Sequence, residues 1–178
     1  SANLKKLLKG IKQTLACKPF VKVCGTTFLI FNGYQTIAQF SWFIIIYYLF
    51  QGDIGVAGNW PAWFATLMAA STLIIVIPIV TKMATKIGKK NAFIVATVIS
   101  IVGYTLKWWG FNPANPWLMF MPIPFLSFGI GGLFTLMMSM TADVCDLDEL
   151  NNDERREGMF GAVYWWMVKL GIAIAMLT

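Results

Sequence analysis

Histidine is absent from this 178-residue sequence, and charged residues make up only 12% of it. An average soluble domain is roughly one quarter charged. The lack of histidine removes the commonest general base and a common metal ligand, and the three cysteines are odd in number and show no paired metal spacing. By contrast, 58% of the residues are hydrophobic and 15% are aromatic. A soluble domain of this length cannot bury so much apolar surface, so the sequence indicates an all-α integral membrane protein.

Five stretches of the chain are apolar enough to cross a bilayer as helices, which takes about 20 residues each. They lie at about 23–50, 61–80, 92–111, 117–141 and 158–178, and together they form an expected transmembrane bundle over residues 23–178. Residues 1–22 carry leucine and isoleucine at helical spacing, with lysines on the opposite face. This pattern predicts an amphipathic linker helix on the membrane surface, although a partner-binding helix has the same pattern.

The distribution of lysine predicts which ends of the spans face the cytoplasm. Lysines gather in residues 1–22 and 81–91, whereas the loops at 51–61 and 112–116 contain neither lysine nor arginine. The N-terminal segment, the 81–91 loop and the acidic segment after 141 should therefore be cytoplasmic. The net charge of +6 then reflects topology rather than nucleic-acid binding. Tryptophan and tyrosine near span ends fit an interfacial belt, where Lys107 is expected to extend toward the membrane surface.

Lys169 lies about eleven residues into the fifth span, which is too deep to reach the surface easily. A lysine at the centre of a membrane helix costs roughly 2.5–3.5 kcal/mol, and such residues usually face a cavity or a partner charge. We interpret Lys169 as part of a transport pathway, with a structural ion pair as the alternative. Trp165 and Trp166 share its helix face, where they could hold the ammonium or stack on a sugar ring. Packing within the bundle would also explain the two tryptophans.

Polar residues form a stripe along the first span, at Asn32, Gln35, Thr36 and Gln39. Unpaired amides are costly in lipid, so this stripe should face other helices or a polyhydroxyl ligand. The fourth span has a different feature, because it is interrupted by Pro122 and Pro124 near its start and by the FGIGG segment at 128–132 near its middle. Such residues allow either kinks near a binding site or close helix packing.

Seven of the eight acidic residues lie between residues 140 and 171. Asp143, Asp146 and Glu149 recur every three residues, which places them on one face at the end of the fourth helix. Acids there oppose the helix dipole and need cationic partners. The nearest are Arg155 and Arg156, and with Glu157 this set predicts a charged latch that opens in one state of the protein. A solvated loop is the alternative, and a metal site of Asp143, Cys145 and Asp146 lacks a complete ligand set.

The segment TADVCDLDE at 141–149, followed by Arg155, Glu157 and an aromatic-rich helix with Lys169, resembles the glycoside–pentoside–hexuronide:cation symporters. These form the melibiose-permease-like branch of the major facilitator superfamily. The resemblance covers the whole chain and implies helices seven to eleven of a carrier with two six-helix bundles, truncated before the last helix. It implies alternating access, a sugar or glycoside substrate and coupling to Na⁺ or H⁺. The cation-binding acids of the family lie in the N-terminal half, outside this chain, and no other cofactor or metal is expected.

The residues and the resemblance together predict a substrate site that contains Asn32, Gln35, Gln39, Tyr164, Trp165, Trp166 and Lys169. Tyr164 and Trp165 stand where the melibiose carrier has small polar residues, so its galactoside specificity is not expected here. The predicted partners are membrane lipid, a sugar and the N-terminal half, in a bacterial inner membrane. A lysolipid symporter and a small multi-span scaffold protein are the alternatives. An enzyme is the least supported reading, because no catalytic set occurs at membrane depth.

Overall fold

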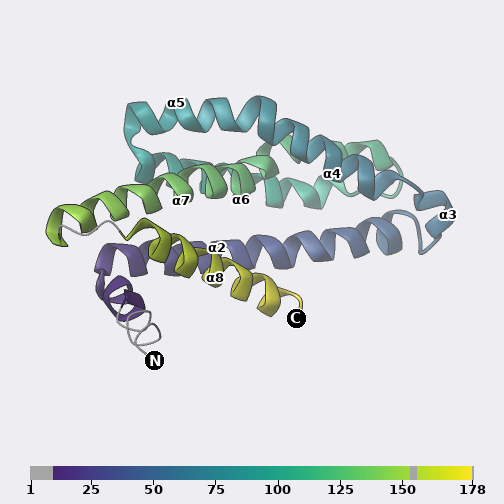
Figure 1. Cartoon of the computed structure of the whole chain (residues 1–178). Helices are drawn as coiled ribbons and strands as arrows, with labels where there is room; N and C mark the ends of the chain where they lie inside the picture. Colours follow the sequence, from purple (N-terminus) through teal and green to yellow (C-terminus); the bar gives the residue numbers. More distant parts are fainter. Residues whose placement is uncertain (1–9, 153–155, 178) are drawn as a thin grey trace. The chain divides into compact units, whose positions relative to one another are not determined.

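The computed structural model describes residues 10–152 and 156–177, which form helices joined by short connections (Figure 1). No strand occurs among these residues, so the predicted all-α architecture is confirmed. The elements in chain order are α2 (Lys18–Phe43), η1 (Ile44–Leu49), α3 (Ile54–Ala57), α4 (Trp60–Ser71), η2 (Thr72–Val76), α5 (Ile77–Ile87), α6 (Lys89–Gly110), η3 (Pro116–Phe120), α7 (Ile123–Asn152) and α8 (Glu157–Ala175). Of the three η elements, η1 and η2 are π-helical and η3 is a 3₁₀ helix.

Five helical stretches are long and apolar enough to cross a membrane, as the composition predicts. They are Lys18–Leu49, Ile54–Ile87, Lys89–Gly110, Pro116–Asn152 and Glu157–Ala175. The predicted amphipathic helix is only partly covered, because residues 10–16 are helical and residues 1–9 lie outside the described part.

Two helices continue beyond the apolar stretches that mark the expected spans. Helix α2 begins at Lys18 rather than near residue 23. Helix α7 continues past residue 141 to Asn152, so the acidic residues up to that point are helical rather than part of a solvated loop. Hydropathy marks only the part of a helix that is apolar, whereas the backbone hydrogen bonds can continue into a polar segment.

The chain divides into two compact units, and helices α2 and α7 each contribute to both. Unit 1 consists of the chain up to Gly33 together with the part from Met137 onward. Unit 2 consists of Tyr34–Leu136.

Unit 2 is built around glycines of α7 that allow other helices to approach closely. A Cβ atom on Gly129 would lie 2.7 Å from the ring of Tyr34, and one on Gly131 would lie 2.8 Å from Val76. A Cβ atom on Gly132 would meet Ala96 at 2.8 Å. Helix α7 is continuous through this segment from Ile123. Of the two explanations that the FGIGG segment leaves open, the structure therefore shows close packing, as in other membrane helix interfaces rich in small residues.

Helices α4 and α5 continue into one another through the π-helical turn η2, and α5 packs against α6 (Figure 1). The turn η2 ends directly before Ile77 and Pro78, the first two residues of α5. Proline has no backbone N–H and its ring clashes with the carbonyl group four residues earlier, so a wider turn at this point is expected. A hydrophobic core lies at the end of unit 2 that contains η1 and η3. It consists of Ile45, Leu49, Phe64, Phe111, Met119, Ile123 and Leu126.

Unit 1 is held together by aromatic packing and by hydrogen bonding between α2 and α8. The rings of Phe20 and Phe160 meet edge to face with centroids 4.7 Å apart, and both are fully buried. Further along the same pair of helices, Gly171 lies beside the rings of Phe28 and Phe31, where a Cβ atom would make ordinary van der Waals contacts of 3.6 Å and 3.7 Å.

Candidate functional site

Helix α8 has one buried face and one exposed face, and the predicted site residues are divided between them. The buried face consists of Phe160, Tyr164, Val168, Gly171 and Ala175. Trp165, Trp166 and Lys169 all lie on the exposed face. The structure thus brings these three together as the spacing predicts, but it places Tyr164 in the core of unit 1 with 1% of its surface exposed.

The exposed face of α8 carries its charge near the middle of a membrane-spanning helix. Lys169 follows the first residue of α8, Glu157, by twelve residues, or about 18 Å along the axis. A bilayer core is about 30 Å thick, so an ammonium group at this depth is far from either surface. Within the described part of the chain, Lys169 has no ion-pair partner and no cation–π contact with either tryptophan. The face therefore requires a polar environment that unit 1 does not itself supply.

Asn32 connects α2 to α8 close to this lysine. Its side-chain Nδ2 donates a hydrogen bond of 3.0 Å to the carbonyl oxygen of Gly171, two residues beyond Lys169. The predicted polar stripe thus has an interhelical role at this residue, because one of its amide groups stabilises the α2–α8 contact.

Gln35 and Gln39 continue the stripe along α2 into unit 2 and are half-buried. Neither amide makes a hydrogen bond to another described residue. A half-buried amide without a partner is costly in an apolar setting, so both groups remain available to a ligand or to another part of the protein.

The ion pair that the structure shows at the C-terminal end of α7 joins Arg156, one of the predicted latch residues, to Asp148, which the three-residue spacing does not include. The guanidinium of Arg156 donates to both carboxylate oxygens of Asp148, with Nη2 at 2.8 Å from Oδ1 and 2.6 Å from Oδ2, and Nε at 3.1 Å from Oδ2. Asn152 adds a third donor through Nδ2, 2.9 Å from Oδ1 of Asp148. This carboxylate is 5% exposed, and a cavity of about 490 Å³ adjoins the pair. Burial and several charge-assisted donors thus hold the Asp148 carboxylate in one position beside Arg156.

The predicted face of Asp143, Asp146 and Glu149 lies on the more accessible side of α7. Asp143 and Asp146 are exposed and Glu149 is half-buried, whereas Asp148 is buried. Arg155 lies outside the described residues, and Glu157 is exposed at the start of α8. Asp148 could have been found from the sequence, because Thr141, Val144 and Asp148 continue the buried face of α7 at helical spacing.

Lys107 is a second cation in a membrane span, and its position differs from the expected one. Its Nζ donates a hydrogen bond to Oγ of Ser41 on α2. The same atom lies 5.3 Å, 5.4 Å and 5.8 Å from the ring centroids of Tyr104, Phe111 and Phe64. The side chain therefore points into unit 2, where aromatic rings replace part of the lost hydration. The expectation that it extends out to the surface is wrong.

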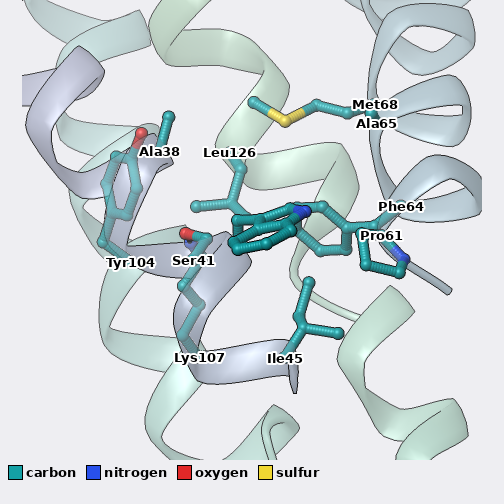
Figure 2. Close-up of a pocket in the computed structure, with 11 residues that line it drawn as sticks. Ala38, Ser41, Ile45, Pro61, Phe64, Ala65, Met68, Tyr104, Lys107 and Leu126 are labelled. Atoms are coloured by element: carbon teal, nitrogen blue, oxygen red, sulfur yellow. Dashed lines mark hydrogen bonds between the residues drawn. The ribbon is translucent and has the colours of Figure 1, made fainter. Parts of the chain in front are cut away.

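A cavity of about 180 Å³ adjoins Lys107 inside unit 2. Figure 2 shows Lys107, Ser41 and Tyr104 on one side of this cavity, with Phe64 and Pro61 on the other. Its walls are otherwise apolar. The sequence contains no signal for this arrangement, because the lysine, the serine and the rings come from α2, α4, α6 and the residue that follows α6.

Comparison with known proteins identifies the group to which these helices belong. The family described as MFS/sugar transport protein matches residues 1–178. An uncharacterized symporter of Synechocystis is 25% identical over 170 residues, covering 96% of this chain and 30% of that protein. The isoprimeverose transporter of Lactiplantibacillus pentosus is 26% identical over 174 residues, covering 98% and 34%. A glucuronide carrier protein homolog of Escherichia coli is 30% identical over 97 residues, covering 54% and 21%.

The chain spans about a third or less of the length of these curated relatives. No solved structure matches it significantly.

Proposed function

Because this chain belongs to the MFS/sugar transport protein family, we propose that it forms part of a cation-coupled sugar symporter that works by alternating access. The family supports transport rather than catalysis, and the relatives support a sugar or glycoside as the transported molecule. All three relatives come from bacteria, which supports a place in a bacterial plasma membrane. Na⁺ or H⁺ is the proposed coupling ion, bound mainly by residues outside this chain.

The observation that carries the proposal is the exposed face of α8, with Trp165, Trp166 and Lys169 at membrane depth. A charged group there is not stable against lipid tails, so this face should border a water-filled pathway or a partner charge. Indole rings stack on the apolar faces of sugars, and an ammonium group donates hydrogen bonds to hydroxyl oxygens. We assign all three residues to the substrate pathway.

Gln35 and Gln39 are proposed as further substrate contacts. Their amides have no hydrogen-bond partner among the described residues, and each offers both donors and an acceptor. Sugar hydroxyl groups need both kinds of partner. Asn32 is assigned a supporting role instead, because its amide already stabilises the contact between α2 and α8. Tyr164 is likewise assigned to packing, because it is buried on the opposite face of α8.

The pair of Asp148 and Arg156 is proposed as the gating latch on the cytoplasmic side. Its guanidinium and carboxylate are almost fully desolvated, with side-chain exposures of 13% and 6%. A pair of this kind is stable only while its geometry is kept, because separating the charges leaves each without a partner. Opening would require that water from the adjoining cavity of about 490 Å³ replaces the lost contacts.

The decisive experiment measures sugar accumulation by the full-length carrier in cells or proteoliposomes under an imposed Na⁺ or H⁺ gradient. The substrate panel includes isoprimeverose and a glucuronide, because relatives are named for them. The variant is Lys169→Leu, with the exposed Lys82 changed to Leu as the matched control. Loss of a charged hydrogen bond of about 1.5–3 kcal/mol predicts that uptake falls by about 10- to 100-fold in Lys169→Leu only.

Normal accumulation by Lys169→Leu would contradict the assigned role of this face. Gradient-driven uptake of a lysolipid, with no sugar transported by the wild type, would replace the substrate class while leaving the mechanism intact.

A further inference from the structure

Lys107 lies between two hollows of unit 2 and borders both. One is the internal cavity of about 180 Å³, and the other is a larger groove of about 950 Å³ between α2 and α6. Ser41 and Tyr104 also line both. The side chain of Lys107 thus borders the groove, and its ammonium group lies beside Ser41 and among the three rings.

The ammonium of Lys107 has no carboxylate partner within the part of the chain that the structure describes. Its contacts are the hydroxyl of Ser41 and three aromatic rings. An ammonium carries three N–H donors, and rings are weaker acceptors than an anionic oxygen. The site therefore favours an anion that can approach through the groove.

The groove itself has the character of a lipid-facing surface near the edge of a membrane. Trp108 is 86% exposed and Trp109 is 66% exposed at the end of α6, and Tyr48 and Phe40 are exposed on the α2 side. Exposed tryptophan and tyrosine at the end of a span are typical of the interface between the hydrocarbon core and the headgroups. The rest of the lining is mainly apolar.

The depth of Lys107 decides between a lipid and a transported solute. It lies three residues before Gly110, the last residue of α6, or about 4.5 Å along the axis. The 22 residues of α6 extend about 33 Å, close to the thickness of the hydrocarbon core of about 30 Å. Lys107 therefore lies near the edge of the hydrocarbon core, within a side chain's reach of the lipid phosphates, and not at the bilayer midplane, where carriers hold their substrates.

We propose that the groove between α2 and α6 binds an anionic phospholipid. The phosphate group accepts hydrogen bonds from Nζ of Lys107, within reach of the Ser41 hydroxyl. One acyl chain lies along the apolar side chains of Phe40 and Ile44. The interfacial rings of Trp108 and Trp109 flank the glycerol region. The site does not depend on which molecule the carrier transports, so its test is independent of the proposed sugar transport.

The test compares lipid retention by the full-length carrier in detergent, measured by native mass spectrometry. Phosphatidylglycerol and phosphatidylcholine with identical acyl chains are titrated separately. The variants are Lys107→Gln, Lys107→Arg and, as a control for an exposed lysine elsewhere, Lys82→Gln. Thermal unfolding of each variant in phosphatidylcholine shows whether the fold is kept.

The wild type should bind phosphatidylglycerol about fivefold more tightly than phosphatidylcholine. This is the affinity ratio that corresponds to about 1 kcal/mol, the contribution of one lysine near an anionic membrane surface. Lys107→Gln should lose this preference, whereas Lys107→Arg and Lys82→Gln should keep it. Equal retention of the two lipids by the wild type would overturn the proposal even if Lys107→Gln did not fold. Persistence of the preference in a folded Lys107→Gln variant would overturn it too.

Competition by a soluble anion distinguishes a lipid site from a solute site. Millimolar inorganic phosphate or glucuronate should leave phosphatidylglycerol bound, because neither supplies an acyl chain for the groove. If either anion displaces the lipid from the wild type but not from Lys107→Gln, the lysine binds a soluble ligand. That result would contradict the lipid site.

Discussion

Lys107 in unit 2 and Lys169 in unit 1 are both lysines within membrane spans, but they have opposite environments. Lys107 is half-buried and contacts a hydroxyl and three rings of its own unit. Lys169 is exposed on α8 and has no partner among the described residues. The difference separates a charge that side chains of its own unit contact from a charge that they leave without a contact. Substitutions of the first kind should change stability, and those of the second kind should change transport.

The largest expected effect concerns the most completely paired charge. Asp148→Ala leaves Arg156 desolvated and without its carboxylate, which should lower the free energy of unfolding by about 3–5 kcal/mol. The exposed Asp146→Ala should change it by less than about 0.5 kcal/mol. Denaturant-induced unfolding in mixed micelles measures both. Similar values for the two variants would show that the buried pair does not stabilise unit 1.

The two lysines can be compared by how much each one's contacts contribute to the free energy of unfolding. Ser41→Ala removes the hydrogen-bond acceptor of Lys107 and should destabilise the protein by about 1–3 kcal/mol. Thr66→Ala is the matched control, because that hydroxyl bonds only within its own exposed helical turn. Lys169→Leu should not lower stability at all, since no contact of the fold is lost. A marked loss of stability in Lys169→Leu would place this lysine with the paired charges.

The tryptophans beside Lys169 should affect substrate affinity rather than folding. Trp165→Ala and Trp166→Ala each remove an exposed ring, and a stacking contact of about 1 kcal/mol predicts a rise in KM of about fivefold. Phe160→Ala on the buried face should instead lower stability by about 3–5 kcal/mol. Initial rates of sugar uptake, normalised to the amount of protein in the membrane, measure the first effect. Unchanged KM in both tryptophan variants would remove them from the pathway.

The smallest predicted effect concerns the amides of α2. Gln35→Ala and Gln39→Ala each remove a hydrogen-bonding group, and a net contribution of about 1 kcal/mol predicts a rise in KM of about fivefold or less. Asn32→Ala should mainly reduce stability, because its partner is the backbone of α8. A reversal of this order, with Asn32→Ala raising KM most, would show that the hydrogen bond to Gly171 is not kept during transport.

The sequence predicts those features that depend on local pattern. The five spans follow from apolar length, and the common face of Trp165, Trp166 and Lys169 follows from helical spacing. Both are properties of single helices, so no tertiary information is needed.

Features that depend on contacts between distant segments could not be obtained in this way. The inward direction of Asp148 follows from helical spacing once α7 is known to continue, but its pairing with Arg156 depends on how the chain returns after α7. The contacts of Lys107 come from α2, α4 and the segment after α6. The sequence does not distinguish the aromatic residues and the serine that contact Lys107 from residues of the same types that face lipid.

The central claim, that the exposed face of α8 borders the substrate pathway, is tested most directly by cysteine accessibility. Ala173→Cys places a thiol one turn beyond Lys169 on the exposed face, and Ala175→Cys places one on the buried face. Both are made in a full-length carrier without other cysteines and treated with a membrane-impermeant thiol reagent. We predict that only Ala173→Cys reacts and that a transported sugar slows its reaction. An unreactive Ala173→Cys, or a reaction that no transported sugar affects, would contradict this account.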